Sequence, residues 1–212
     1  FFVNLDAIFV NIMEARNFIT AREMIMDYNW LLTTINGEPR YQKPPLPTWL
    51  TAFSAMIFGL KSLIGLRLPA AIMGMMTVLF SYKLAEKFTQ SKQYALISGS
   101  IMATSFYIIF AGRNGQWDIF THAFMMGSIY FLFRFFTTEE KLYQNALIAA
   151  LFFAASFMSK GPVSLYALWL PFMIAFGMTY RYKSMKKRIW PLIGFILIAI
   201  LLSSWWHWYV YT

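Results

Sequence analysis

Six long apolar runs occupy the chain after residue 62 and predict membrane-spanning helices. They cover about 64–82, 94–111, 119–136, 145–158, 163–180 and 191–210. A helix needs about 20 mostly apolar residues to cross the hydrocarbon core of a bilayer. The run 145–158 is short for a full crossing, whereas the other five approach that length. The pattern therefore predicts an all-α integral membrane protein, a polytopic helical bundle with about six spans.

Residues 1–62 are mixed rather than continuously apolar, and they predict two helices that lie near the membrane surface. The first runs from about Asn11 to Asp27, where apolar and charged side chains are interleaved. The second runs from about Leu46 to Leu60, because the preceding Pro44-Pro45 pair is tolerated only at the start of a helix. We therefore expect residues 1–62 to form an extracytoplasmic loop with juxtamembrane amphipathic helices, and 63–212 to form a transmembrane helix bundle.

The distribution of basic residues predicts the orientation in the membrane. If successive spans alternate in direction, the loops 83–93, 137–144 and 181–190 share one side, opposite residues 1–62. The basic residues of these loops are Lys83, Lys87, Lys92, Lys141, Arg181, Lys183, Lys186, Lys187 and Arg188. Cytoplasmic loops are enriched in Lys and Arg, so this side is expected in the cytoplasm. The net charge of +9 then reflects topology, and no nucleic-acid partner is expected.

Composition supports a membrane protein and excludes several kinds of chemistry. The chain is 59% hydrophobic and 13% charged, which leaves too few charges to cover a soluble domain of 212 residues. It has no cysteine, so disulfides, thiol catalysis and cysteine-ligated metals are excluded. It starts at Phe1 without a methionine and stops directly after an apolar run, so we expect a fragment of a longer protein.

Four polar clusters fall on the side that holds residues 1–62. They are Glu14 with Arg16, Gln42-Lys43-Pro44-Pro45, the stretch from Arg113 to Asp118, and Ser159-Lys160-Gly161-Pro162. Ionisable groups at a membrane boundary cost several kcal/mol unless they are paired or solvated. A helix bundle could gather these clusters around one outward-facing cavity, which would then be a candidate site.

Each cluster also has a simpler structural interpretation. The charges between Asn11 and Asp27 fit the wet face of an interfacial helix with surface ion pairs. Lys43 and Lys160 could extend their amines to lipid headgroups, and Arg113 and Asp118 could form a local turn pair. His122 and His207 have no His or Cys partner at metal-ligand spacing, so structural roles are expected for them. The residues alone leave these alternatives open.

The order of several short motifs resembles a known family. The motifs are Met13-Glu14-Ala15-Arg16, Ala21-Arg22-Glu23-Met24, Asn36-Gly37-Glu38-Pro39-Arg40-Tyr41, Lys43-Pro44-Pro45, Arg67-Leu68-Pro69, Arg113 with Asp118, and Ser159-Lys160-Gly161-Pro162. Together they resemble the lipid A aminoarabinose transferases, which are relatives of the protein O-mannosyltransferases. The resemblance spans nearly the whole chain and implies a membrane glycosyltransferase of the GT-C type.

The resemblance also implies an activity and a set of site residues. Such enzymes move a sugar from a polyprenyl-phosphate carrier to a lipid or protein acceptor on the extracytoplasmic side, here of a bacterial inner membrane. The implied catalytic residues are Glu14 and Asp118, and the implied donor-phosphate ligands are Lys43, Arg113 and Lys160. The implied supporting residues are Arg16, Tyr41 and Gln42. Membrane lipids complete the expected partners.

Two positions depart from the pattern of the family. Met13 stands where relatives have an Asp that is favoured as a catalytic group, and Gln42 stands where they often have a Glu. That Glu helps to hold a metal in relatives, so Gln42 argues against a divalent metal, and no cofactor is assigned. Met13 also leaves a noncatalytic relative as an alternative. A transporter or flippase is the other alternative, although transporters tend to place ionisable residues near the bilayer midplane.

Overall fold

The structure, a computed structural model, describes residues 1–180 and 185–212 and is helical apart from one short hairpin. The helices are α1 (Ile12–Met26), α2 (Leu46–Phe58), α3 (Leu63–Thr89), α4 (Lys92–Thr104), α5 (Phe106–Gly112), α6 (Trp117–Thr137), α7 (Leu142–Lys160), the π-helix η1 (Leu165–Trp169), α8 (Leu170–Tyr180), the 3₁₀-helix η2 (Met185–Arg188) and α9 (Ile189–Tyr211). Strands β1 (Thr34–Ile35) and β2 (Glu38–Pro39) pair antiparallel.

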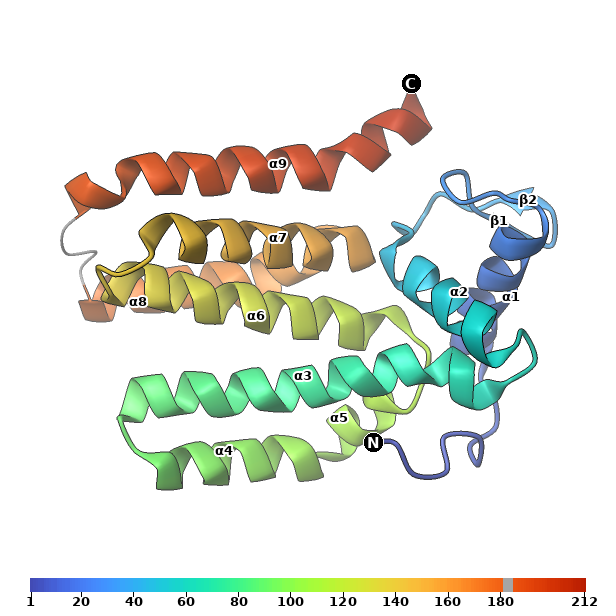
Figure 1. Cartoon of the computed structure of the whole chain (residues 1–212), viewed down its shortest axis with the longest axis horizontal. Coiled ribbons are helices and arrows are strands. Elements are labelled where there is room, and N and C mark those ends of the chain that lie inside the picture. The colour runs from blue at the N-terminus through green and yellow to red at the C-terminus, as the bar shows by residue number, and fades with distance from the viewer. Residues whose placement is uncertain (181–184) are drawn as a thin grey trace.

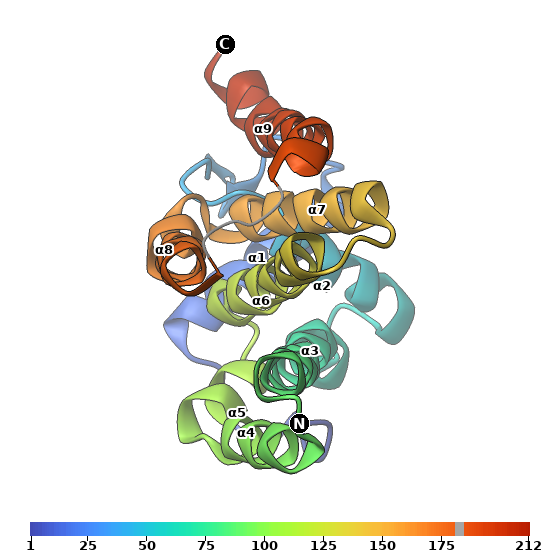
Figure 2. The same ribbon diagram turned by 90° about the vertical axis from the view of Figure 1, so that its left-hand side faces the viewer.

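The long helices lie side by side along one axis, and α1, α2 and the hairpin cover one end of the bundle (Figure 1). The turns that join α3 to α4 and α6 to α7 lie at the opposite end. An end-on view shows α6 near the middle, with α3, α7 and α8 around it (Figure 2). Consecutive helices therefore alternate in direction, and the polar clusters named above fall at the end that carries α1 and α2.

The predicted fold class is confirmed. Among the described residues, four helices are long and apolar enough to cross a membrane, namely α3, α6, α7 and α9, and α4 with α5 makes a fifth if this pair, bent by 63°, is one span. The predicted run 163–180 corresponds to a shorter apolar helix over Leu165–Thr179. Gly161, which has a positive φ, and Pro162 end α7 and separate it from this helix.

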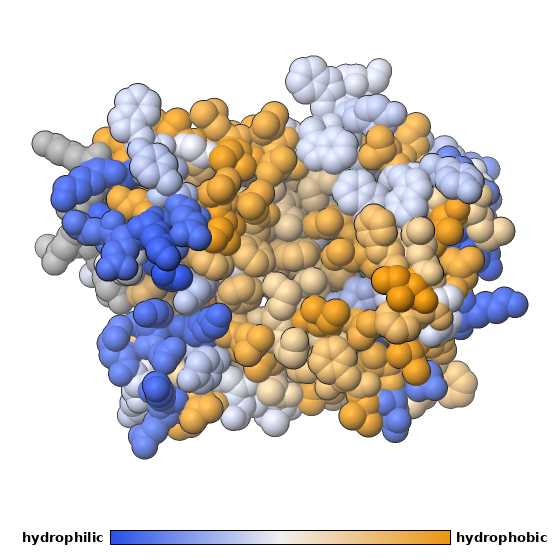
Figure 3. Space-filling model, viewed as in Figure 1, coloured by the Kyte–Doolittle hydropathy of each residue, from blue (hydrophilic) through white to orange (hydrophobic). Residues whose placement is uncertain are grey.

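The surface of the bundle carries an apolar belt between two more polar ends (Figure 3). Large apolar side chains of α4 and α9 are exposed, and Ile101, Leu197 and Leu201 are 63%, 62% and 66% exposed. In water such a surface would be unfavourable, whereas in hydrocarbon it is the expected covering. The helices suit this surrounding because they satisfy their backbone hydrogen bonds internally.

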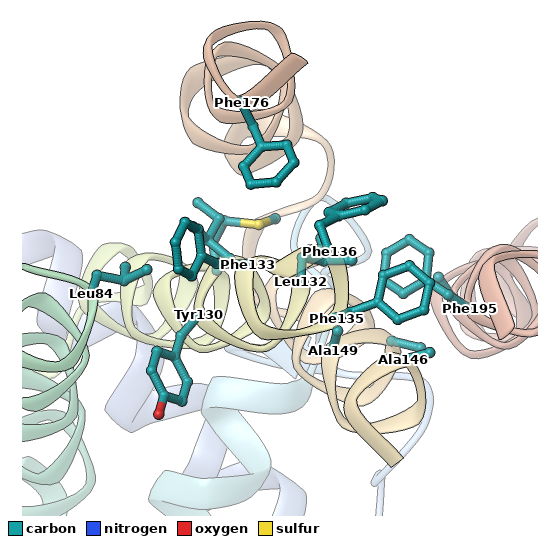
Figure 4. Packing of buried hydrophobic residues seen from close by; sticks show 14 residues of the cluster. Leu84, Tyr130, Leu132, Phe133, Phe135, Phe136, Ala146, Ala149, Phe176 and Phe195 are labelled. Atoms are coloured by element: carbon teal, nitrogen blue, oxygen red, sulfur yellow. The ribbon is translucent and has the colours of Figure 1, made fainter. Parts of the chain in front are cut away.

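Helix α6 supplies most of the bundle core. Its buried Leu132, Phe133 and Phe135 pack with Phe176 of α8 and Phe195 of α9 (Figure 4). On the α7 side, small residues let the two helices approach closely, and these are Ala146, Ala149 and Ala150, each at most 2% exposed. Close approach of small residues is the usual way in which membrane helices associate.

Two serine hydroxyls add hydrogen bonds between α6 and α7. Ser128 donates to the carbonyl of Ala149 at 3.0 Å, and Ser156 donates to the carbonyl of Thr121 at 2.8 Å. These four residues are buried, and interhelical bonds of this kind contribute about 0.6 kcal/mol each in membrane proteins. They fix the lengthwise position of α7 against α6, and so fix where Lys160 lies relative to Asp118.

Pro69 inside α3 creates a gap in the helix that α2 fills. Proline has no N–H, so the carbonyl of Gly65 four residues earlier receives no intrahelical bond. The buried hydroxyl of Ser54 donates to that carbonyl instead. Ser54 of α2 thereby satisfies a backbone carbonyl of α3 and connects the two helices.

We predict that Ser54→Ala lowers the free energy of unfolding by about 1–3 kcal/mol, because the buried Gly65 carbonyl loses its only described donor. In a Pro69→Ala background the loss should be much smaller, since position 69 regains an N–H for the same carbonyl. Thermal unfolding of the full-length protein in detergent measures both, with the exposed Ser204→Ala as control. Equal losses in the two backgrounds would contradict this explanation.

Candidate active site

Glu14 and Arg67 form an ion pair that is completely buried. Asn11 caps the start of α1, which places Glu14 in the first turn of that helix. The Glu14 carboxylate accepts from Nε of Arg67 at 2.6 Å and from Nη2 at 2.8 Å, and both side chains are 0% exposed. The backbone N–H of Gly115 donates to the same carboxylate at 2.9 Å. The pair therefore joins α1, α3 and the segment that leads into α6.

This burial bears on the catalytic role predicted for Glu14. Both carboxylate oxygens are occupied by donors, and neither has surface open to an acceptor. A general base must lie within hydrogen-bond reach of the proton that it removes. In this arrangement Glu14 holds α1 against α3 and the segment before α6 through Arg67 and Gly115. Its catalytic role stays a prediction.

Asn17, one turn after Glu14, adds a second buried connection. Its amide donates to the carbonyl of Gly115 at 2.8 Å and to the hydroxyl of Thr51 at 3.1 Å, and its oxygen accepts from Thr48 at 2.8 Å. Buried polar groups cost free energy unless they are paired, and every partner here is buried or part-buried. The surface helices α1 and α2 are thus fixed to the bundle at a defined height.

Asp118 and Lys160 form a second ion pair, which is partly open. Asp118 lies in the first turn of α6, and Lys160 ends α7. The carboxylate and the amine are in direct contact, and their side chains are 29% and 28% exposed. An acid at a helix start and a base at a helix end are each favoured by the helix dipole. The pair is therefore well placed but remains accessible.

Lys43 lies within electrostatic range of this pair. Burial lowers the pKa of the Lys43 amine, Lys160 and Arg40 lower it further, and Asp118 partly offsets them. The structure thus places Lys43 within electrostatic range of Asp118 and Lys160, although about 40 residues or more separate the three along the chain. A cationic centre of this kind suits a negatively charged ligand.

A cavity of about 370 Å³ adjoins this centre through Lys43. Its lining residues are Met13, Arg16, Ile35, Pro39, Arg40, Gln42, Lys43 and Trp117. Two of the predicted supporting residues, Arg16 and Gln42, are exposed here, whereas Tyr41 is half-buried and does not line the cavity. Met13 is 43% exposed on the same wall. The lining carries three cations and no carboxylate.

Arg113 does not line this cavity, and its guanidinium is bound near the start of the chain. Its Nη2 donates to the carbonyl of Asn4 at 2.6 Å, and Nε is buried without a hydrogen-bond partner among the described residues. The alternative of a turn pair between Arg113 and Asp118 is wrong, because Asp118 pairs with Lys160. Arg113 does not line the cavity of Lys43, so its predicted role as a phosphate ligand stays a prediction.

The hairpin that carries the cavity wall is anchored by Glu23. The carboxylate of Glu23 accepts from the hydroxyl of Thr34 at 2.7 Å and from the backbone N–H of Asn36 at 2.6 Å. Asn36 and Gly37 both have positive φ, as a tight two-residue turn between antiparallel strands requires. This anchoring places the segment from Pro39 to Lys43 against α1 and Trp117.

Four residues of this region were not predicted as site residues from the sequence. Arg67 and Arg40 were quoted in motifs without a role, although a charge near the start of an apolar helix is itself a signal of function or pairing. His122 lies one turn after Asp118 and interacts electrostatically with Asp118 and Lys160. The ring of Tyr107 lies 6.5 Å from that of His122. Only the three-dimensional arrangement relates these two rings to the site.

A family model described as dolichyl-phosphate-mannose-protein mannosyltransferase matches residues 42–208, which is more than half of the chain. The chain belongs to this family. The resemblance to the aminoarabinose transferases is thereby confirmed at the level of the family, and so is the expectation of a membrane glycosyltransferase of the GT-C type.

Two curated proteins illustrate the similarity of this chain to known sequences over most of its length. A protein of Aquifex aeolicus called uncharacterized is 30% identical over 91% of this chain and 37% of its own length. The undecaprenyl phosphate-alpha-4-amino-4-deoxy-L-arabinose arabinosyl transferase of Pseudomonas savastanoi pv. phaseolicola is 26% identical over 90% of this chain and 34% of its own length. The chain therefore spans about a third of the length of these relatives.

Two solved structures of this family share the fold. The crystal structure of ArnT from Cupriavidus metallidurans bound to undecaprenyl phosphate aligns with a TM-score of 0.84 at 20% identity, covering 99% of this chain and 39% of that one. The apo structure of the same protein aligns with a TM-score of 0.81 at 18% identity, covering 95% of this chain. At these identities the likeness concerns the fold alone.

The residues near Gln42 do not fit the metal site that the family resemblance implies. Gln42 is exposed on a cavity wall that has no carboxylate. Among the described residues, no group of three His, Cys, Asp or Glu side chains could hold a metal ion.

We predict that Glu14→Gln lowers the free energy of unfolding by about 3–5 kcal/mol, because it leaves the buried Arg67 charge uncompensated. The double substitution Glu14→Gln with Arg67→Met should lose less than the single change. Thermal unfolding of the full-length protein measures both, with the exposed Glu38→Gln as control. A Glu14→Gln variant as stable as the control would show that the pair does not anchor α1.

Proposed function

We propose that the protein containing this chain transfers a sugar from a polyprenyl-phosphate carrier to a lipid or protein acceptor at the extracytoplasmic face of a bacterial inner membrane. The observation that carries the proposal is the partly exposed Asp118–Lys160 pair at one end of an apolar bundle, with the Lys43 amine within electrostatic range of it. Membership of the mannosyltransferase family and the similarity to the arabinosyl transferase of Pseudomonas savastanoi, which is named for an undecaprenyl phosphate-linked sugar, support the choice of donor.

Donor chemistry explains why the site needs cations. Breaking the bond between the anomeric carbon and the phosphate oxygen leaves the electron pair, and a second negative charge, on the departing polyprenyl phosphate. Positive groups placed where this charge develops stabilise the transition state. Lys43 and Lys160 would supply them, and the polyprenyl tail would lie in lipid along the apolar belt seen in Figure 3. No nucleotide-binding domain is needed for such a donor.

In this proposal Asp118 activates the acceptor. A hydroxyl acceptor must lose its proton as it attacks the anomeric carbon, and a carboxylate within reach is the usual base. Asp118 is 29% exposed and contacts Lys160, whereas the Glu14 carboxylate is fully buried. A bound donor phosphate would compete for Lys160 and leave Asp118 free to take the proton. An acceptor that attacks through a phosphate oxygen would need no base.

The same proposal determines how the chain is oriented in the membrane. Residues 1–62, with α1, α2 and the hairpin, would form the extracytoplasmic layer, and residues 63–212 would form the first part of the membrane domain. The basic loops at the other end of the bundle would then face the cytoplasm, as the positive-inside rule requires. Of the predicted basic residues there, Arg181 and Lys183 lie outside the described residues.

One observation favours a second candidate, a relative that binds the carrier lipid without transferring its sugar. Met13 is exposed on the cavity wall at the position where relatives have an Asp. If that acid is indispensable, this chain retains the cationic site but lacks a catalytic group. Transfer of a radiolabelled sugar from a polyprenyl-phosphate carrier by the full-length protein distinguishes the two candidates.

We predict that Lys43→Ala and Asp118→Asn each lower the rate of transfer by about 100-fold or more, because one removes a charge from the leaving-group site and the other removes the base. The matched control is Lys61→Ala, an exposed lysine at the same end of the molecule. Transfer by Lys43→Ala at the rate of the control would remove the phosphate-binding role of Lys43.

The lowered pKa of Lys43 gives a prediction for pH dependence. Burial and the neighbouring Lys160 disfavour the charged amine, so Lys43 loses its proton at a lower pH than an ordinary lysine does. As pH rises through this pKa, kcat/KM for the donor should fall. The Lys43→Arg variant should lose that alkaline fall, because Arg stays protonated. An identical pH profile in this variant would exclude Lys43 as the titrating group.

A further inference from the structure

Arg40 lines the same cavity as Lys43, and several contacts hold its guanidinium in one position. Its Cζ lies 4.6 Å from the centroid of the Trp117 ring, a cation–π distance. Its Nη1 donates to the hydroxyl of Thr20 at 2.9 Å and to the carbonyl of Arg16 at 3.3 Å. Trp117 is 3% exposed and opens α6, so the stacking platform is part of the rigid bundle.

The contacts of Arg40 leave one edge of its guanidinium available. Both hydrogen bonds described for the side chain use Nη1, and Nε and Nη2 have no hydrogen-bond partner among the residues that the structure describes. Arg40 lines the cavity of about 370 Å³ that Lys43 also lines. The Nε–Nη2 edge of a guanidinium matches two oxygens of a phosphate. The side chain is thus held on one edge and open to an anion on the other.

Among the described residues, neither Arg40 nor its neighbour Arg16 is paired with a carboxylate. Arg16, Arg40 and Lys43 share the cavity, and neither arginine forms an ion pair within the described part of the chain. Burial and Arg16 lower the pKa of Arg40, which shows that the two cations repel each other. The cavity lining includes no carboxylate. An anion bound in the cavity would relieve the repulsion.

We propose that Arg40 is a phosphate-binding residue of the site, holding the donor phosphate through its Nε–Nη2 edge while Lys43 contacts the same group. The inference rests on the proposed function and adds a residue to it. The phosphodiester of the donor carries one negative charge, and the polyprenyl phosphate released when the sugar leaves carries two. Arg40 therefore binds the released carrier more strongly than the intact donor and favours the transfer step.

Binding of undecaprenyl phosphate to the full-length protein in nanodiscs tests this inference without depending on turnover. Arg40→Lys keeps the charge but loses the fork, and Arg40→Gln loses both. We expect Kd to rise about 10-fold for Arg40→Lys and up to about 100-fold for Arg40→Gln, which is the range for charge-assisted hydrogen bonds. The control is Arg22→Gln, an exposed arginine of α1 that lines a different cavity. Thermal unfolding without ligand checks that each variant is folded.

Separate outcomes test the two proposals. If wild type binds undecaprenyl phosphate, Lys43→Ala weakens binding, and both Arg40 variants bind within twofold of Arg22→Gln, the role of Arg40 is excluded and the proposed function stands. If wild type shows no binding, the proposed function fails and this inference fails with it. Equal binding by wild type and Arg40→Lys, with a loss only in Arg40→Gln, would exclude the two-oxygen contact.

Discussion

Two fully buried charges, Glu14 and Arg67, hold the surface layer of this protein against its membrane bundle. Their two short hydrogen bonds connect α1 to α3, and the N–H of Gly115 connects both to the start of α6. A buried pair gives little net stability compared with apolar packing, but breaking it is costly because one charge is then left unpaired. The pair therefore fixes the position of α1 relative to α3 and to the start of α6, and the residues of the proposed site are placed by these elements.

The membrane imposes the remaining constraint. Helices in hydrocarbon satisfy their backbone groups internally, and charged side chains gather at the ends of spans, where water is near. Asp118 begins one helix and Lys160 ends the next, so the antiparallel pair α6 and α7 brings them together. Lys43, in the loop between the hairpin and α2, lies within electrostatic range of both. The polar site is thus a consequence of how consecutive spans alternate in direction.

Sequence patterns predicted the helical bundle, its alternation and the gathering of polar clusters at one end, because hydrophobic run length and charge placement are local properties. They did not indicate the bend after Thr104 or the late start of η1, because these depend on the backbone at Ser105 and Gly161. Burial was also hidden from the sequence. Glu14 and Asp118 are both acids in the first turn of a helix, yet one is fully buried and the other is partly open.

The role of Arg40 illustrates a further limit. A motif shows that an arginine precedes the Lys-Pro-Pro segment, but not that its guanidinium lies over Trp117 with one edge unoccupied. That arrangement depends on Glu23, which anchors the hairpin, and on the start of α6, far along the chain. Contacts of this range come from tertiary structure, so the sequence suggests which residues matter and the fold decides what each of them does.

The most direct test of this account is an experimental structure of the full-length protein with undecaprenyl phosphate bound in a lipid nanodisc. The account predicts that the phosphate lies within hydrogen-bond distance of the Lys43 amine, next to the Asp118–Lys160 pair, with Glu14 still paired to Arg67 beneath it. A phosphate bound elsewhere, with Lys43 unoccupied, would contradict the proposal that these residues form one reaction centre.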